Sequence, residues 1–269
     1  MLPKIVEQKI REVAALKERV SIKDMEQHIA GMAPCISMKE RFLKRNRPVG
    51  VIAEVKKASP SKGVIREYFD PVDIAVRYGN ANVEAISVLT DEQFFQGSLQ
   101  YLTAIKHQLS STPLLRKDFN IDPIQLYEAR ANGADAVLLI AAILEKEKLK
   151  EMANEAKNLG LDILVEVHTA EELETVLSTI EPDLLGINNR DLKTFTTSLD
   201  RTFELIKQIP AGIVKISESG IATRADIERL AEAGADGVLV GETFMRQPDV
   251  TGAVFSLVGP ASSRYGVRA

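Results

Sequence analysis

Eight short apolar runs alternate with amphipathic segments after Val49, and this alternation constrains the fold more than any other feature of the sequence. The runs cover residues 49–56, 83–90, 112–119, 135–142, 161–168, 183–190, 212–219 and 236–243. The segments between them have helical periodicity, as in residues 123–133, 149–160 and 222–234. Alternation of strands and helices is typical of βαβ units. The sequence therefore predicts an α/β fold built on parallel strands.

The number of units favours a closed (β/α)8 barrel, or TIM barrel. The chain has 269 residues, close to the usual size of that fold, which is about 250 residues. A doubly wound open sheet is the alternative. Against it, none of the eight runs ends in the GxGxxG pattern, and a GxxxxGK motif followed by Ser or Thr is absent from the sequence. We predict a barrel of residues 49–269 that carries the catalytic site.

Residues 1–48 show helical patterns and no strand pattern. The apolar positions at helical spacing in the first segment are Ile5, Ile10, Val13 and Leu16. Ser21 and Ser37 are each followed three residues later by an acidic residue, which predicts the starts of two further short helices. We predict a helical extension over residues 1–48 that packs on the barrel, the two together forming a single domain.

Composition argues against several classes of function. The chain has 34 basic and 38 acidic side chains, and a net charge of −4 does not favour nucleic-acid binding. Cys35 is the single cysteine, and the three histidines lack the spacing of a His/Cys metal site. The N-terminal segment is charged throughout, unlike a signal peptide, and no segment approaches about 18 uncharged apolar residues. We expect a cytoplasmic protein, a monomer, with no metal, nucleic-acid or membrane partner.

Charged residues occur near the ends of several runs, where the site of a (β/α)8 barrel forms. Side chains alternate between the two faces of a strand, so Glu54 and Lys56 share a face with Ile52. The opposite face is apolar and suits the surrounding helices. Glu54 and Lys56 are therefore predicted to point into the barrel mouth, whereas Lys57 has the opposite parity and is predicted to lie outside it.

The same parity test extends the candidate site to other runs. It pairs Lys117, Glu166 and Glu218 each with an apolar residue two positions earlier. Five runs then deliver six polar side chains to one mouth, which are Glu54, Lys56, Lys117, Glu166, Asn188 and Glu218. Structural ion pairs are the alternative interpretation. Burying several charges is costly even when they are paired, so the set favours acid–base catalysis.

Two glycines indicate a phosphate site. Gly220 follows the seventh run and Gly241 ends the apolar part of the eighth. Loops after strands seven and eight form the usual phosphate site of this fold, through backbone N–H groups. Turn glycines without a ligand are the alternative, but their placement favours phosphate.

Three further features near the mouth are less specific. The loop over residues 57–63 contains small polar residues and is consistent with either a flap or a plain surface loop. Phe95 and Phe119 could form aromatic walls or belong to the core. His168, two residues after Glu166, is predicted to be solvated and without a partner.

The motifs, in this order, resemble the indole-3-glycerol phosphate synthase family of tryptophan biosynthesis. The matching segments are IAEVKKASPSKG, LTDEQFFQGS, LLRKDF, LVEVH, GINNRDL, SESGI and VLVGETFMR, and they cover essentially the whole barrel. The resemblance implies a carboxy-lyase without cofactor that acts on a phosphorylated small molecule, 1-(2-carboxyphenylamino)-1-deoxyribulose 5-phosphate, releasing CO2 and water. Another phosphosugar isomerase, or a non-catalytic binding protein, remains the competing hypothesis.

The resemblance also implies roles for matching residues. Lys117 would be the general acid in ring closure, Lys56 would hold the anionic substrate and donate a proton, and Glu54 would be the base in dehydration. The remaining implied acid–base and orienting residues are Glu166, Asn188, Glu218 and Ser219. The implied phosphate ligands are Gly220, Val240, Gly241 and Glu242, and the implied contacts to the rest of the substrate are Ser59, Pro60, Phe95, Phe119, Arg190 and Leu192.

Overall fold

Eight parallel strands close into a barrel in the computed structural model, which describes residues 1–191, 194 and 196–261. The barrel strands are β1 (Gly50–Val55), β4 (Ala85–Leu89), β5 (Leu114–Lys117), β6 (Ala136–Ile140), β7 (Asp162–Val167), β8 (Leu184–Asn188), β9 (Val214–Glu218) and β10 (Gly237–Val240). Each pairs with the next along the chain, and β10 pairs with β1 to close the ring. The predicted (β/α)8 barrel is confirmed, and the open-sheet alternative is wrong.

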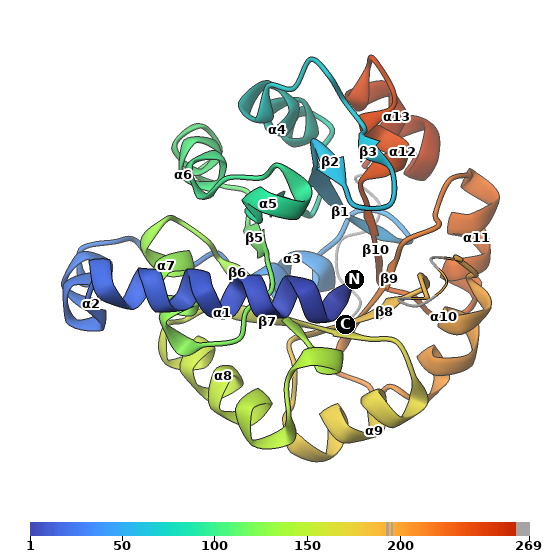
Figure 1. Ribbon diagram of the computed structural model, residues 1–269. Coiled ribbons are helices and arrows are strands. Elements are labelled where there is room, and N and C mark those ends of the chain that lie inside the picture. Colours follow the sequence, from blue (N-terminus) through green and yellow to red (C-terminus); the bar gives the residue numbers. More distant parts are fainter. Residues whose placement is uncertain (192–193, 195, 262–269) are drawn as a thin grey trace.

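Helices cover the outer face of the barrel (Figure 1). They are α4 (Pro71–Asn80), α6 (Leu99–Gln108), α7 (Pro123–Ala131), α8 (Lys146–Asn158), α9 (Ala170–Thr179), α10 (Asp200–Leu205), α11 (Arg224–Glu232) and α13 (Val250–Val258). Shorter elements are the strands β2 (Ala58–Ser59) and β3 (Gly63–Val64), the helices α5 (Glu92–Phe95) and α12 (Glu242–Met245), and the 3-10 turns η1 (Ala141–Ile143) and η2 (Ile206–Gln208). Among the described helices, none is both long and apolar enough to cross a membrane.

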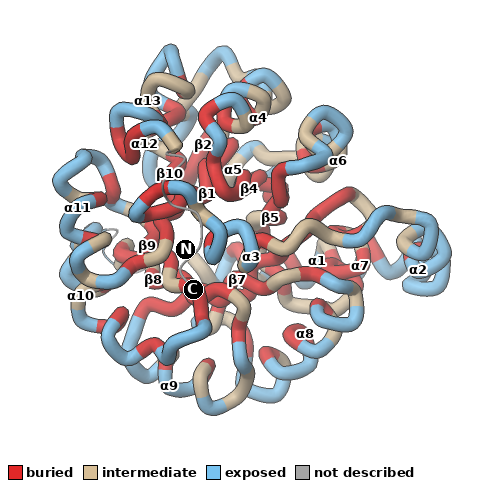
Figure 2. Tube along the Cα trace, turned by 180° about the vertical axis from the view of Figure 1, so that it is seen from behind, coloured by how far each residue is buried: buried red, intermediate tan, exposed pale blue. Residues whose placement is uncertain are grey.

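Apolar side chains fill both faces of the barrel wall. Val51 and Ala53 of β1 belong to the core between strands and helices, whereas Ile52 belongs to the inner core. This is the alternation that the sequence predicted. Figure 2 shows the buried residues concentrated in the strands and the exposed ones on the outer helices.

The first residues of the chain form three helices that reach both ends of the barrel. They are α1 (Leu2–Arg19), α2 (Ile22–Ala30) and α3 (Met38–Leu43). In Figure 1, α1 runs across the barrel opening. At the other end, the Phe42 ring of α3 is fully buried in the inner core. It packs where β1 and β10 begin, since a Cβ at Gly50 or Gly237 would overlap this ring.

The serine caps are confirmed, but the buried face of α1 differs from the prediction. Ser21 and Ser37 accept hydrogen bonds from backbone N–H groups three residues later, at the starts of α2 and α3. On α1, Ile10 is 58% exposed and Lys9 is only 2% exposed. The spacing of apolar residues predicted Ile10 on the buried face of α1. It missed Lys9 because a lysine is not expected on a buried helix face.

Candidate active site

A cavity of about 560 Å³ opens at the carboxyl ends of the barrel strands. All the described candidate residues line it, namely Glu54, Lys56, Ser59, Pro60, Phe95, Lys117, Phe119, Glu166, Asn188, Arg190, Glu218, Ser219, Gly220, Val240, Gly241 and Glu242. The remaining candidate, Leu192, lies outside the described residues. Period-two alternation in the strands therefore brings residues from distant parts of the chain to one mouth.

Lys117, the last residue of β5, lies among three buried carboxylates. Its Nζ is 3.7 Å from Glu54 Oε1, 3.9 Å from Glu166 Oε2 and 3.9 Å from Glu218 Oε2. Burial alone would lower the pKa of Lys117, but the attraction of the carboxylates outweighs it and raises the pKa above its ordinary value. Lys117 is therefore a cation held against three potential proton donors or acceptors.

Glu54 also pairs with Lys56, its neighbour on the inner face of β1. The distance from Lys56 Nζ to Glu54 Oε2 is 2.6 Å. Burial would raise the pKa of Glu54, but Lys56 and Lys117 outweigh it, and the pKa falls below its ordinary value. Glu54 is thus a carboxylate that bridges the two lysines.

Glu166 and Glu218 have pKa values pushed in opposite directions. Burial would raise the pKa of Glu166, but the His168 ring, with Nε2 3.3 Å from Oε1, and the charge of Lys117 lower it. Burial raises the pKa of Glu218, and the negative charge of Glu166 raises it further. Two acids that differ in this way supply one ionised and one protonated carboxyl in the same cavity.

Space for the Glu218 side chain comes from Gly186 on the neighbouring strand β8. A Cβ at residue 186 would overlap Glu218 Oε1. No sequence pattern distinguishes this glycine from the others. Its role depends on the pairing of β8 with β9, in which Gly186 is opposite Ile216 and Asn188 is opposite Glu218.

The loops after β9 and β10 form the end of the cavity where phosphate binding is predicted. Ser219 and Gly220 both have positive φ, at 69° and 77°, which turns the chain sharply after β9. Such a conformation is uncommon for a serine and is frequent at functional sites. Glu242 directs its carboxylate to Arg246, with Oε1 2.8 Å from Nη2, so its side chain is engaged within its own helix.

Aromatic and aliphatic side chains form another part of the cavity lining. The rings of Phe95 and Phe119 lie 6.0 Å apart, measured between centroids. Met1, Leu2 and Ile5 of α1 also line the cavity. Sequence reasoning missed this contribution because helical periodicity identifies a buried face but not the surface that it covers.

The loop after β1 carries its own short hairpin, in which β2 and β3 pair antiparallel. Ser59 is buried in β2, and Pro60 follows it. Arg190, after β8, reaches this loop, with Nη1 3.5 Å from Ser61 Oγ. The contact joins the loops that follow β1 and β8 across the cavity.

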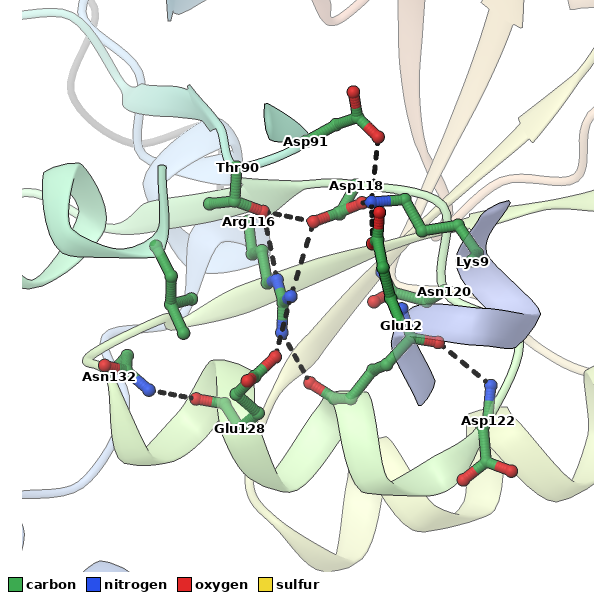
Figure 3. Close-up of polar contacts among 12 residues, drawn as sticks. Lys9, Glu12, Thr90, Asp91, Arg116, Asp118, Asn120, Asp122, Glu128 and Asn132 are labelled. Atoms are coloured by element: carbon green, nitrogen blue, oxygen red, sulfur yellow. Dashed lines mark hydrogen bonds and ion pairs between the residues drawn. The ribbon is translucent and has the colours of Figure 1, made fainter. Parts of the chain in front are cut away.

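A buried lysine joins α1 to the rim of the cavity (Figure 3). Lys9 Nζ lies 2.7 Å from Glu12 Oε2, 2.8 Å from Asp91 Oδ2 and 2.9 Å from Asp118 Oδ1. Asp91 also caps α5, accepting hydrogen bonds from the N–H groups of Phe94 and Phe95. Lys9 therefore connects the first helix to the loop that presents Phe95. The sequence offered one weak signal, a charged residue between apolar helical positions.

The prediction for His168 is wrong. It is 6% exposed, and its ring lies between two carboxylates. The distances are 3.3 Å from Nε2 to Glu166 Oε1 and 3.3 Å from Nδ1 to Glu172 Oε2. Glu172, in the first turn of α9, provides the partner that inspection of the strand alone did not find. Among the described residues, no group of three or more His, Cys, Asp or Glu side chains could hold a metal ion.

Fold and site together define a (β/α)8-barrel enzyme whose acid–base groups gather at the carboxyl ends of the strands. A family model described as indole-3-glycerol phosphate synthase matches residues 2–257. The chain therefore belongs to the indole-3-glycerol phosphate synthase family.

Individual relatives agree with this assignment. The chain is 50% identical over 223 residues to an indole-3-glycerol phosphate synthase of Bacillus pumilus, covering 83% of this chain and 89% of the relative. It is 46% identical over 266 residues to that of a Geobacillus species, covering 99% and 100%. Among solved structures, a chain of the Pyrococcus furiosus tryptophan synthase α2β2 complex aligns with a TM-score of 0.57 at 16% identity, covering 80% of this chain and 98% of that one. This last likeness concerns the fold alone.

Proposed function

We propose that this chain catalyses the synthesis of indole-3-glycerol phosphate from 1-(2-carboxyphenylamino)-1-deoxyribulose 5-phosphate, as a carboxy-lyase that uses side chains in place of a cofactor. The observation that carries the proposal is the position of Lys117, whose ammonium lies within 4 Å of three buried carboxylates in a chain of this family. Ring closure requires an acid at the ribulose carbonyl, and a cation positioned against that oxygen supplies it.

Each proposed step has a matching group. Lys117 donates a proton to the carbonyl oxygen as the aromatic carbon attacks it. Loss of CO2 from that carbon then returns the bonding electrons to the ring. Lys56 protonates the departing hydroxyl, which leaves as water, and Glu54 removes the proton that completes the indole. The pair of Glu54 and Lys56, 2.6 Å apart, supports this division because one proton can be exchanged between them.

Four further residues are proposed to orient the substrate and the lysines, namely Glu166, Asn188, Glu218 and Ser219. The opposite pKa shifts of Glu166 and Glu218 support a shared role, in which the first accepts and the second donates hydrogen bonds to substrate hydroxyls. Both carboxyls contact Lys117. The ionised Glu166 would hold the acid in its charged form until the carbonyl oxygen arrives.

The two ends of the cavity suit the two ends of this substrate. We assign the phosphate to the backbone around Gly220, Val240, Gly241 and Glu242. The anthranilate ring is assigned to the wall formed by Phe95, Phe119 and Pro60, and its carboxylate to Arg190 and Ser59. The apolar side chains of α1 that line the cavity suit a substrate with an aromatic ring.

The cellular and quaternary setting is part of the same proposal. We infer a monomer that acts in the cytoplasm, with residues 1–48 as a helical extension and residues 49–269 as the catalytic barrel of one domain. The contacts of α1 at the mouth and of α3 at the other end of the barrel support a single domain.

The test is the ring-closure assay, which follows the fluorescent indole product. Wild-type protein should form product, and Lys117→Ala should lose at least about 100-fold in kcat, since a general acid contributes roughly 100- to 10,000-fold. Lys17→Ala is the matched control, because Lys17 is a half-exposed lysine of α1 outside the cavity. Absence of product from folded wild-type protein, or full activity of Lys117→Ala, would contradict the proposal.

A further inference from the structure

His168 links a carboxylate of the cavity to the outer ring of helices. It follows β7 directly, so its ring is on the same side as Glu166, two residues earlier. Its Nε2 faces Glu166 and its Nδ1 faces Glu172, each at 3.3 Å. Glu172 Oε2 also accepts a 2.6 Å hydrogen bond from the His168 backbone N–H. The ring is therefore held from α9 while it contacts the active-site carboxylate.

The surroundings of His168 favour its cationic form. The titratable groups that face it are Glu166 on β7, Glu172 on α9 and Glu218 on β9. Lys117 on β5 lies beyond Glu166. The turn η1, which packs against β7 and α9, contributes Ala141, Ala142 and Ile143 and no titratable side chain. Burial would lower the pKa of His168, but Glu166 and Glu172 outweigh it and raise the pKa to about 9.

An imidazolium at this position decides which of two carboxyls holds a proton. Glu166 and Glu218 share Lys117, and both are buried. Mutual repulsion of two ionised carboxylates in such a site favours a proton on one of them. His168 contacts Glu166 directly, so its charge stabilises the ionised form of Glu166 and leaves the proton on Glu218.

We propose that His168 is a positioning residue for the ring-closing reaction, which holds Glu166 ionised and directed at Lys117 and is itself held by Glu172. The inference rests on the proposed function, because it assigns His168 a role through Glu166. It concerns a histidine that touches no substrate atom in that scheme, since His168 does not line the cavity.

The test compares His168→Gln with wild type in the ring-closure assay across pH. Glutamine keeps hydrogen-bonding capacity but cannot carry the charge. We expect kcat to fall about tenfold, less than the roughly 100-fold or more of a direct acid–base group, with KM changed less than kcat. The acid limb of the kcat profile should move to higher pH, because without the cation Glu166 is protonated at higher pH. His107→Gln, an exposed histidine of α6, is the matched control and should behave as wild type.

A double variant tests whether the effect acts through Glu166. In a Glu166→Gln background, His168→Gln should cause little further loss, since the carboxylate that it acts on is absent. Independent, multiplicative losses would overturn the inference. So would an unchanged kcat and pH profile for His168→Gln in an assay where wild type is active. An inactive wild type would instead reject the proposed function.

A second variant keeps the proposal testable if His168→Gln does not fold. Glu172→Gln keeps the imidazole of His168 but removes the carboxylate that holds it. It should shift the acid limb in the same direction by a smaller amount. A folded Glu172→Gln variant with the wild-type profile would count against the proposal.

Discussion

Lys9 Nζ lies 2.9 Å from Oδ1 of Asp118, the residue that follows the proposed general acid Lys117. Successive residues at the end of β5 thus contact different partners, Lys117 the three carboxyls of the cavity and Asp118 the lysine of the first helix. Asp118 also contacts Arg116 and Thr90. The ion pair fixes α1 to the same strand end that presents the acid.

Removal of Lys9 should destabilise the fold strongly. Lys9→Met would leave Asp91 buried without its cation and Asp118 with Arg116 alone, and breaking a buried pair from one side costs about 3–5 kcal/mol. Lys17→Met, on the same helix, removes a pair to Asp122 whose lysine is 52% exposed, and should cost about 1 kcal/mol or less. The free energy of unfolding from denaturant titration measures both. Equal losses in the two variants would show that the buried cluster is not the anchor of α1.

The same cluster predicts a loss of stability in acid. Burial would raise the pKa of Asp118, but Arg116 and Lys9 outweigh it and lower the pKa to about 2. An unfolded aspartate has a pKa of about 3.9, so the charged form stabilises the fold fully above that pH, and the contribution disappears as pH falls toward 2. Between pH 4 and pH 2, wild type should therefore lose stability more steeply than Asp118→Asn. Parallel curves for the two proteins would rule out this contribution.

Gly186→Ala should impair catalysis through Glu218. The added methyl group would overlap Glu218 Oε1, so the acid must shift from its position beside Lys117. We expect kcat to fall by about tenfold or more and stability to fall by about 1–3 kcal/mol, as for overpacked cores. Gly31→Ala is the control, since its new Cβ would meet only an ordinary contact at 3.6 Å. A Gly186→Ala variant with wild-type kcat would argue that the position of Glu218 does not matter.

The adjacent lysines of the first strand should differ sharply. Lys56 contacts Glu54 in the cavity, whereas Lys57 does not line it. Lys56→Met should reduce kcat by about 100-fold or more, in line with loss of a proton donor, and Lys57→Met by less than about threefold. Steady-state kinetics on the two variants checks this. Similar losses in both would place the proton donor elsewhere.

Strand alternation made most of the fold and the site predictable. Because side chains on a strand have a period of two, Lys56 could be separated from Lys57 and assigned to the mouth. The same rule carried Lys117, Glu166 and Glu218 there, and the closed barrel brought both carboxyls within 4 Å of the Lys117 ammonium. Periodicity within each strand was sufficient to predict these site residues because closure of the barrel brings the carboxyl ends of all eight strands together.

Contacts between separate elements could not be predicted in this way. Lys9 finds its partners on loops far along the chain, and the spacing of apolar residues pointed to Ile10 instead. His168 is held by Glu172, four residues later but across the turn from strand to helix. Gly186 matters only once β8 lies beside β9. In each case the cause is a tertiary neighbour.

The placement of α1 at one end of the barrel and α3 at the other has a consequence for the order of folding. Phe42 is buried between the starts of β1 and β10, the first and last strands of the ring, and Lys9 pairs with residues that follow β4 and β5. The Phe42 site is complete only after β10 has paired with β1, and the Lys9 site requires β4 and β5 side by side. Contacts between residues so distant in sequence form slowly. We therefore expect the segment that a ribosome makes first to dock late, α1 after β4 and β5 have paired and α3 after the ring has closed.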